Sequence, residues 1–352
     1  MNRILLDCER TKYPHTGLFH FCQQLGNALI RHADRERERL TFYVPRGQRS
    51  LFGPEQDYFF HRDFHKLWIP GTRSFNVWHC TYQNSRLLPR PGSTRIVLTI
   101  HDLNFLIEKK AKTGKIKGRL RQVQSNIDRA DHIVCVSQFT LTTVTTHLRL
   151  EDRPVEVIYN GCSVNDFPAF EQPRYRPGRP YIFSLGTVLP KKNFHVLPRL
   201  LAGNDYELVI AGILNSDYGK IVRAEAARHG AQNRVRLVGP ITEQEKSWYF
   251  RNCLAFAFPS VAEGFGLPVV EAMHYGKPVF LSNRTSLPEI GGSEAYYFAD
   301  FDPAAMQEVF TRGMTDYFSQ AKAEKIRKRA QRFSWDQAAR DYLNVYRKWA
   351  PL

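Results

Sequence analysis

Residues 254–272 read LAFAFPSVAEGFGLPVVEA, an apolar run followed by a turn with two glycines and then by an amphipathic stretch. The uninterrupted run Leu254–Phe258 is typical of a strand that is covered on both faces. Pro268 suits the first turn of a helix, because a proline there removes no helical hydrogen bond. The stretch therefore predicts a strand, a tight turn and a helix over residues 266–275, which is the building unit of a parallel α/β sheet.

The same unit recurs on both sides of this stretch, through residues 181–352. Short apolar runs alternate there with stretches of helical periodicity, and this alternation predicts βαβ units. We expect strands at Tyr181–Leu185, Tyr206–Ala211, Arg234–Val238, Leu254–Phe258, Pro278–Leu281 and Ala295–Phe298. We expect helices between them, over residues 194–202, 217–229, 243–252 and 266–275.

The first half of the chain shows the same alternation less regularly. Its candidate strands are Arg3–Leu6, Leu40–Val44, Val77–Cys80, Ile96–Ile100, Ile133–Val136 and Val155–Tyr159. Four prolines in residues 167–180 predict a linker, and a last helix with one apolar stripe begins near Asp336. We therefore predict an α/β protein with two doubly wound domains, residues 1–170 and 171–335, followed by a helix over residues 336–352.

Charge is unevenly distributed along the 352 residues, which carry a formal net charge of +16. Residues 1–180 hold 28 Lys and Arg against 17 Asp and Glu, a net +11, whereas residues 181–352 hold 22 against 17, a net +5. This excess predicts an anionic partner for the first half. The apolar run Ile4–Leu6 is too short for a signal peptide, and no stretch approaches the roughly 20 apolar residues of a membrane span. We therefore expect a cytoplasmic protein.

Two glutamates flank the glycine turn, Glu263 before it and Glu271 about one helical turn into the helix. Both carboxylates can face one cleft and accept hydrogen bonds from sugar hydroxyls. The amides of the turn predict a helix N-terminus that favours anions. These amides belong to Gly264, Phe265, Gly266 and Leu267. The alternative, two solvated glutamates beside a simple turn, is disfavoured by the complete string after a strand.

A second polar loop follows the predicted strand Tyr181–Leu185. It contains Gly186 and Thr187, and then the basic pair Lys191 and Lys192 before Asn193. Asn193 can cap the next helix, and a lysine at this place can neutralise a diphosphate as a point charge. A solvated lysine is the alternative. The interpretation as a diphosphate site is favoured because the loop lies at the carboxyl end of a strand, where open α/β sheets bind ligands.

Two loops of the first half occupy the same kind of position. His101 and Asp102 follow the strand that ends at Ile100, and Gly17 opens a helix in the loop after the first strand. A structural His-Asp pair and a simple tight turn are the alternative interpretations. If the loops bind ligand, they do so at the carboxyl edge of the first sheet.

These motifs together resemble those of the retaining GT-B glycosyltransferases of family 4, over nearly the whole chain. The resemblance is carried by Glu263…Glu271, Ala211-Gly212, residues 235–239, Phe258-Pro259-Ser260, Glu271-Ala272-Met273, Gly276-Lys277-Pro278-Val279, Leu287-Pro288-Glu289, His101-Asp102, residues 130–137 and residues 157–161. It implies two Rossmann-like domains facing a cleft, with the last helix crossing back to the first domain.

The resemblance also assigns roles to individual residues. It implies that Glu271 binds the ribose of a nucleotide sugar and that Glu263 binds the transferred sugar. It implies that Lys192 binds the diphosphate together with Lys191, with Gly17 near it. His101 would lie near the sugar and the acceptor, beside Asp102. One departure is Thr187, where many members have arginine, and the basic pair is taken as its replacement.

The resemblance implies a hexosyl transfer from a UDP- or GDP-sugar to an acceptor hydroxyl, with retention of configuration. Catalytic roles fall to His101, Glu263 and Lys192. No DxD-type acidic pair stands at a strand end of the second domain, so we expect no metal and no cofactor. The basic first half fits a glycan or lipid-linked acceptor, such as a precursor of bacterial surface polysaccharide or lipopolysaccharide.

A basic run over residues 109–121 carries seven cations and follows His101 closely. Its lysines are Lys109, Lys110, Lys112, Lys115 and Lys117. A solvated face is one interpretation. The other is peripheral docking on the anionic inner leaflet of a membrane, where each basic residue adds about 1 kcal/mol.

Other classes of protein are less well supported by the sequence. A nicotinamide oxidoreductase would have a GxGxxG turn after the first strand, which Tyr13–Leu18 does not supply. A basic nucleic-acid-binding protein could use the lysine run, but no recognition motif for nucleic acid accompanies it, so no nucleic-acid partner is expected. An inactive GT-B partner subunit stays open as an alternative, although Glu263, Glu271 and Lys192 are all present.

Overall fold

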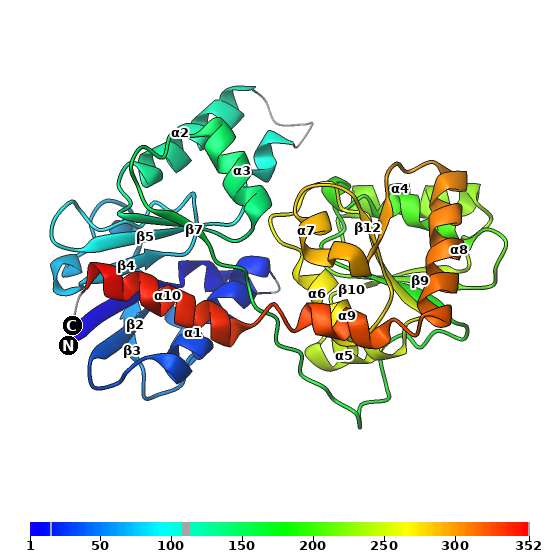
Figure 1. Cartoon of the computed structure of the whole chain (residues 1–352), viewed down its shortest axis with the longest axis horizontal. Helices are drawn as coiled ribbons and strands as arrows, with labels where there is room; N and C mark the ends of the chain where they lie inside the picture. The colour runs from blue at the N-terminus through cyan, green and yellow to red at the C-terminus, as the bar shows by residue number, and fades with distance from the viewer. Residues whose placement is uncertain (15, 108–112, 351–352) are drawn as a thin grey trace. The chain divides into compact units, whose positions relative to one another are not determined.

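The computed structural model describes residues 1–14, 16–107 and 113–350. The chain divides into two compact units, and each is an α/β layer structure around a parallel sheet (Figure 1). Unit 1 contains Met1–Gly161 and Ser334–Leu352, and unit 2 contains Cys162–Phe333. The chain therefore leaves unit 1 earlier than residue 170, the boundary expected from the prolines.

Unit 1 holds a seven-stranded parallel sheet in the order β3-β2-β1-β4-β5-β6-β7. Its strands are β1 (Asn2–Asp7), β2 (Glu38–Val44), β3 (Asp57–Phe60), β4 (Val77–Cys80), β5 (Arg95–Ile100), β6 (His132–Cys135) and β7 (Val155–Val157). The order reverses direction between β1 and β4. Open α/β sheets bind ligands at such a switch point, beyond the carboxyl ends of the strands.

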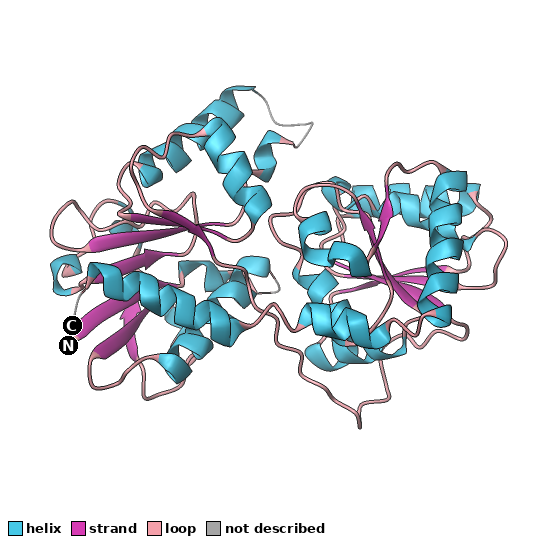
Figure 2. Cartoon of the chain, viewed as in Figure 1, coloured by secondary structure: helices cyan, strands magenta, loops and turns pink. Residues whose placement is uncertain are grey.

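Helices flank the sheet of unit 1 on both sides (Figure 2). They are α1 (Gly17–His32), α2 (Thr113–Ile127), α3 (Gln138–His147) and α10 (Trp335–Trp349). The last helix, α10, packs beside α1 and reaches the sheet through two buried tyrosines (Figure 1). The hydroxyl of Tyr342 lies 2.9 Å from the hydroxyl of Thr99, and that of Tyr346 lies 2.7 Å from Nδ1 of His79. The apolar stripe of the last helix is thus part of the core of unit 1.

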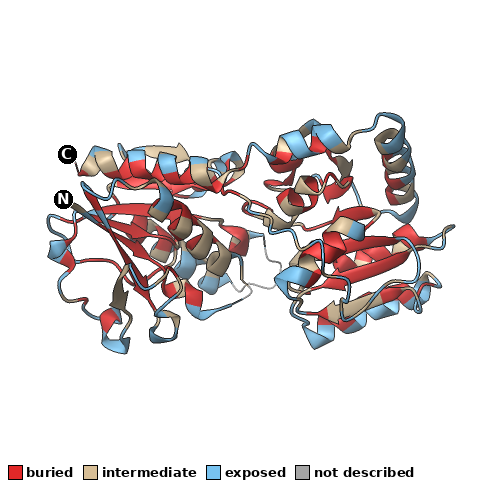
Figure 3. Cartoon of the chain, turned by 90° about the horizontal axis from the view of Figure 1, so that it is seen from below, coloured by how far each residue is buried: buried red, intermediate tan, exposed pale blue. Residues whose placement is uncertain are grey.

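Unit 2 holds a six-stranded parallel sheet in the order β10-β9-β8-β11-β12-β13, with its switch point between β8 and β11. Its strands are β8 (Tyr181–Leu185), β9 (Glu207–Ala211), β10 (Val235–Gly239), β11 (Ala255–Phe258), β12 (Val279–Ser282) and β13 (Tyr296–Phe298). The α-helices are α4 (Ser216–Arg228), α5 (Glu243–Asn252), α6 (Leu267–His274), α7 (Leu287–Gly291), α8 (Pro303–Ser319) and α9 (Ala323–Ala330). The strands of both sheets are mostly buried, as Figure 3 shows in red.

Glycine is required at position 161, where the chain leaves unit 1. A Cβ at Gly161 would lie only 2.0 Å from the backbone nitrogen of Trp335, the first residue of α10. Within unit 2, the amide of Cys162 donates to the carbonyl of Phe333 at 3.0 Å. The outgoing and returning segments are therefore packed backbone against backbone, and only a residue without a side chain fits at position 161.

Three sequence-based expectations need correction or refinement in this architecture. The strand β3 (Asp57–Phe60) was not predicted, and it is a half-buried edge strand. The expected helix at residues 194–202 is the 3-10 helix η7 (Phe194–Leu201), and it contains Pro198, which cannot donate a backbone hydrogen bond. Asn193 does not cap it with its side chain, because this residue adopts a left-handed conformation with φ of 58°.

The proline-rich stretch that predicts a linker packs on the surface of unit 2. Arg174 donates through Nε to Oε1 of Glu245 at 3.0 Å, and the hydroxyl of Tyr249 donates to the carbonyl of Tyr175 at 2.7 Å. Both partners lie on α5. Prolines mark a segment without regular secondary structure here, but that segment is held in place by side-chain contacts.

Candidate functional site

Two loops meet at the switch point of unit 2, one after β8 and one after β11. Nζ of Lys192, at the end of the 3-10 turn η6 (Pro190–Lys192), donates to Oε1 of Glu263 at 2.6 Å. The side chains are only 13% and 14% exposed, so the ion pair is largely shielded from solvent. Ser260 donates its hydroxyl to the same carboxylate oxygen at 2.5 Å. The strand ends thus hold a cation and an anion side by side at the sheet edge.

The backbone around Lys192 is fixed by the neighbouring loop. The amide of Val261 donates to the carbonyl of Lys191 at 2.9 Å, and the hydroxyl oxygen of Ser260, whose proton goes to Glu263, lies 3.1 Å from the same carbonyl. The ammonium of Lys192 also lies 4.7 Å from the ring centre of Phe258, within range of a cation–π contact. These contacts restrict both the backbone and the side chain, so the positive charge is preorganised.

Gly186 makes room for this lysine at the end of β8. Its φ is 149°, a conformation that L side chains rarely adopt, and a Cβ there would lie 3.2 Å from Cε of Lys192. A larger residue would therefore push the lysine stem away from Glu263. Thr187, the next residue, is half-buried beside it.

The helix α6 begins beside this ion pair with little to neutralise its N-terminus. Gly266 precedes the helix with φ of 109° and provides no side-chain cap. The first turn of this helix, which the structure describes in full, contains no acidic residue. Pro268 lies in that first turn, as predicted. The hydroxyl of Ser286 donates to the carbonyl of Phe265 at 3.0 Å and fixes the turn. Helix N-termini of this kind attract anions through their amides and dipole.

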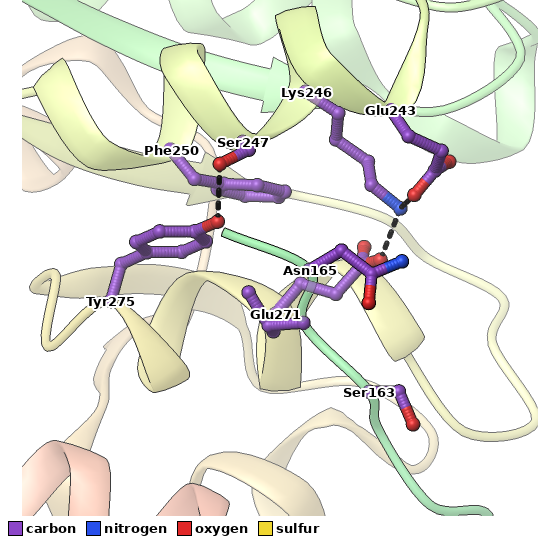
Figure 4. A pocket seen from close by; sticks show the side chains of 9 residues that line it. Ser163, Asn165, Glu243, Lys246, Ser247, Phe250, Glu271 and Tyr275 are labelled. Atoms are coloured by element: carbon purple, nitrogen blue, oxygen red, sulfur yellow. Dashed lines mark hydrogen bonds and ion pairs between the residues drawn. The ribbon is translucent and has the colours of Figure 1, made fainter. Parts of the chain in front are cut away.

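Glu271 lies one turn further along α6 and has a different partner (Figure 4). Its Oε1 accepts a hydrogen bond from Nζ of Lys246 on α5 at 2.7 Å, and Lys246 also lies 2.9 Å from Oε2 of Glu243. Burial alone would lower the pKa of Lys246, but the two carboxylates raise it above its ordinary value. The lysine therefore remains charged beside Glu271.

A small pocket opens around this second ion pair (Figure 4). Ser163 and Asn165 line it on the incoming chain, and Tyr275 closes another side with its hydroxyl 2.8 Å from that of Ser247. The lining is polar around Glu271 and aromatic near Phe250 and Tyr275. The carboxylate and hydroxyl groups of this lining can form hydrogen bonds with the hydroxyl groups of a ligand.

His101 lies at the carboxyl end of β5 in unit 1. Nε2 of its ring lies 2.9 Å from the carbonyl oxygen of Thr81, so this nitrogen carries the proton, and its amide donates to Oε1 of Gln83 at 3.2 Å. Burial lowers the pKa of His101 to about 4. The imidazole is therefore neutral near pH 7, and its Nδ1 is a hydrogen-bond acceptor.

Asp102 and Gly17, the other candidate site residues of unit 1, lie in segments that are stabilised by local hydrogen bonds. Oδ1 of Asp102 accepts from the amide of Asn104 at 2.9 Å. Gly17 is the first residue of α1, and the hydroxyl of Thr16 caps that helix by accepting from the amide of Phe19 at 3.3 Å. Gly17 follows β1 and His101 follows β5, so both lie at the carboxyl edge of the sheet in unit 1.

Comparison with known protein families assigns the chain. The family described as "Glycosyltransferase Family 4" matches residues 23–166, and that described as "Glycosyl transferases group 1" matches residues 167–333. The chain belongs to the family-4, group 1 glycosyltransferases. The resemblance carried by Glu263…Glu271 and its flanking motifs is thereby confirmed.

Two relatives of this glycosyltransferase chain come from Escherichia coli. Serotype-specific mannosyltransferase WbdA is 28% identical over 268 residues, which are 70% of this chain and 32% of WbdA. O-antigen chain mannosyltransferase B is 24% identical over 272 residues, which are 72% of this chain and 70% of that protein. The chain thus spans about a third of the length of WbdA but most of the second relative.

Solved structures confirm the GT-B fold. Sucrose-phosphate synthase from Thermosynechococcus elongatus superposes with a TM-score of 0.77 over 99% of both chains, at 17% identity. Alr3699/HepE from Anabaena, solved in complex with UDP and glucose, superposes with a TM-score of 0.71 over 100% of both chains, at 18% identity. At these identities the likeness concerns the fold alone.

The structure brings together some of the residues that the sequence singled out. Lys192 and Glu263 are in direct contact, with Gly186 beside them and the start of α6 following Glu263. Glu271 is in a separate ion pair. Of the basic run, Lys115 and Lys117 are exposed on α2, whereas Lys109, Lys110 and Lys112 lie outside the described residues.

The sequence did not reveal two residues that hold the candidate site together, Lys246 and Ser260. Lys246 lies three residues after Glu243, a spacing that indicates only a pair within one helix. Its second contact, with Glu271, depends on how α5 packs near α6, which sequence spacing does not encode. Ser260 follows β11 in a Pro-Ser pair, and its position after a strand is the one local signal that could have identified it.

Proposed function

We propose that this family-4 glycosyltransferase moves a hexosyl group from a nucleotide diphosphate sugar to an acceptor hydroxyl, with retention of anomeric configuration. The observation that carries the proposal is the preorganised Lys192–Glu263 pair beside the N-terminus of α6. It combines a fixed cation, a carboxylate and a helix end at the switch point of the sheet. These three groups can together bind a sugar that carries a diphosphate.

The cation and the helix end suit the leaving group. When the bond between sugar and diphosphate breaks, negative charge develops on the departing nucleoside diphosphate. The ammonium of Lys192 and the amides at the start of α6 stabilise that charge without further reorganisation. Glu263 accepts hydrogen bonds from hydroxyls of the transferred sugar, while Ser260 holds its carboxylate in place.

Glu271 suits the nucleoside part of the donor. One of its oxygens is engaged by Lys246, and the carboxylate lines the pocket described above. A ribose hydroxyl pair can donate to the other oxygen. The aromatic side chains of Phe250 and Tyr275 line the same pocket. A UDP- or GDP-sugar is the donor class that we propose.

Membership of family 4 supports the proposal of retention, and the proposal assigns no nucleophile to the protein. In our proposal no covalent intermediate forms with the protein. The departing phosphate oxygen takes the proton of the acceptor hydroxyl, and the acceptor attacks the face from which the diphosphate leaves. Electrons of the broken glycosidic bond go to the phosphate, and the new bond forms from the acceptor oxygen to the anomeric carbon.

His101 is the residue of unit 1 that we place near the sugar and the acceptor. Its neutral imidazole presents Nδ1 as a hydrogen-bond acceptor. Replacing His101 with alanine is expected to lower the turnover number at least tenfold while nucleoside diphosphate affinity changes less than about twofold, because the imidazole would orient the sugar or the acceptor and not the nucleotide. Steady-state kinetics and calorimetry check this. Equal losses of turnover number and nucleotide affinity would indicate that His101 has a structural role only.

The donor proposal is tested by a panel of UDP-, GDP-, ADP- and dTDP-sugars in calorimetry. One class should bind and raise the melting temperature by mass action. The panel is repeated with EDTA, because we propose that Lys192 takes the place of a metal and that no cofactor is needed. Binding and turnover should be unchanged by EDTA. A strong loss that Mg²⁺ or Mn²⁺ reverses would contradict the metal-free proposal, and no binding of any donor would favour an inactive partner subunit.

The acceptor that we propose is a glycan or lipid-linked glycan of bacterial surface polysaccharide synthesis. The relative O-antigen chain mannosyltransferase B supports it by its name, as does the cationic first half of the chain. No helix among the described residues is long and apolar enough to cross a membrane. We propose peripheral association with the inner face of the membrane, to which Lys115, Lys117 and the rest of the basic run contribute charge.

A further inference from the structure

The turn after β3 exposes three large apolar side chains. Phe64 is 45% exposed, Leu67 is 87% exposed and Trp68 is 50% exposed. The amides of Leu67 and Trp68 both donate to the carbonyl of Phe64, at 2.9 and 3.1 Å, so the segment forms a helical turn. Residues spaced three and four apart on a helical turn share one side of it. The three apolar side chains therefore form one exposed patch, which we call the apolar turn.

The apolar turn is anchored to the core by the residues between and after its exposed members. His65 is buried, and its Nδ1 lies 2.8 Å from the hydroxyl of buried Tyr43 on β2. Ile69 belongs to an apolar core cluster of unit 1 together with Phe75. The exposure of the patch is therefore a fixed feature, because the backbone on both sides is tied to the sheet.

Exposed cations lie within the apolar turn and on α2, on the same face of the sheet. Arg62 and Lys66 are exposed within the turn, against the single acid Asp63. The cluster that contains Ile69 also contains Val123 and Ile127 of α2, so the turn and α2 cover one face of the sheet. The exposed cations of α2 are Lys115, Lys117, Arg119 and Arg121.

We propose that this face of unit 1 docks on an anionic lipid bilayer, with the apolar turn inserted among the headgroups. Tryptophan and phenylalanine favour the membrane interface, where their rings are buried beside polar groups. Cations attract anionic headgroups, but that attraction is screened by salt. The combination of an anchored apolar turn with cations on the same face of the sheet matches a lipid surface better than a neutral protein partner.

The apolar turn would be the insertion site for the peripheral membrane association proposed above. Its biological role rests on that proposed function, but its binding to lipid can be measured independently. Lipid docking and sugar transfer are measured separately. A wild-type protein that binds a donor but no anionic vesicles would therefore reject the docking site alone, and a wild-type protein that binds the vesicles but no donor would reject the transferase proposal alone.

The test uses the full chain with vesicles of phosphatidylglycerol mixed with phosphatidylcholine, and with vesicles of phosphatidylcholine alone. Co-sedimentation at low and at high salt measures the partition coefficient. The variant Phe64→Ser/Leu67→Ser/Trp68→Ser should lose at least tenfold in partitioning to the anionic vesicles and should lose the part that persists at high salt. The matched control is Ile221→Ser/Phe318→Ser, which removes exposed apolar side chains of unit 2 and should partition like the wild type.

Tryptophan fluorescence provides a direct readout of insertion. The five tryptophans all lie in the described ranges, and Trp68 alone among them is exposed. Brominated lipids should quench its emission in the wild type, and Trp68→Phe should bind equally while losing that quenching. The proposal is overturned if the serine variant binds as the wild type does, if the wild type ignores anionic vesicles at low salt, or if the serine variant only abolishes a concentration-dependent dimer in solution.

Discussion

Replacing Lys192 with alanine is expected to reduce the turnover number by about 10²–10³-fold, the usual loss when one preorganised stabiliser of transition-state charge is removed. Lys192 is held by Glu263 and lies over Phe258 at the switch point of unit 2. Its charge is therefore in place before the diphosphate begins to leave. Single-turnover kinetics with saturating donor measure the loss without the contribution of product release.

The folded state of the Lys192 variant needs its own measurement. Glu263 would lose one partner but keep the hydroxyl of Ser260, so we expect a lowered melting temperature with a cooperative transition preserved. Lys220→Ala is the matched control, since Lys220 forms an exposed ion pair with Asp217 on the surface of α4. A Lys192→Ala protein that is folded and turns over normally would show that the lysine does not stabilise the leaving group.

Replacing Glu271 with alanine is expected to weaken nucleoside diphosphate binding by roughly ten- to hundredfold. A hydrogen bond to a charged group contributes about 1.5–3 kcal/mol, and the ribose hydroxyls would lose the acceptor that lines the pocket. Turnover at saturating donor should change less than affinity, because Glu271 is assigned to the nucleoside and not to the reacting carbon. Calorimetric titration with UDP and GDP measures the change.

The neighbouring Glu243 provides a control for this second variant. Both glutamates bond to Lys246, but Glu243 is exposed on α5 and its carboxylate has no assigned contact with the donor. Glu243→Ala should therefore leave nucleotide affinity within about twofold of the wild type. Equal losses in the two variants would mean that the ion-pair network, rather than a bond from Glu271 to the ribose, determines the affinity.

Most strands could be predicted because their residues are buried on both faces. The runs at Tyr181–Leu185 and Val77–Cys80 match β8 and β4 to the residue. The edge strand β3 escaped prediction because DYFF is half-buried and follows no regular alternation. The other edge strands, β7, β10 and β13, were predicted from their apolar runs, so position at an edge does not by itself hide a strand. β3 is held by its pairing with β2, a tertiary contact that its sequence does not indicate.

Local conformation was predicted less well where backbone geometry outweighs side-chain preference. Asn193 is a common capping residue, yet here it takes a left-handed conformation between two short 3-10 helices. Pro268, in contrast, occupies the first turn of α6 as expected. The difference lies in the chain itself, since Pro198 prevents a regular α-helix after Asn193 but no such residue interrupts α6.

The glutamates of the candidate site could be singled out from sequence, but their partners could not. Glu263 and Lys192 are 71 residues apart, and Glu271 and Lys246 are 25 apart. Sequence places each of these side chains at a strand end or on a helix. The tertiary structure determines which lysine pairs with which glutamate. The order of strands at the switch point brings Lys192 to Glu263, and the packing near α5 and α6 brings Lys246 to Glu271.

The central claim is retaining transfer from a nucleotide diphosphate sugar, and time-resolved proton NMR tests it most directly. The protein is incubated with the donor that the calorimetric panel selects, with its anomeric carbon α-linked to the diphosphate, and the first anomer to appear is recorded with an acceptor or with water. Release of nucleoside diphosphate together with an α-configured sugar is the predicted result. A β-configured first product, or an unconsumed donor, would contradict the account.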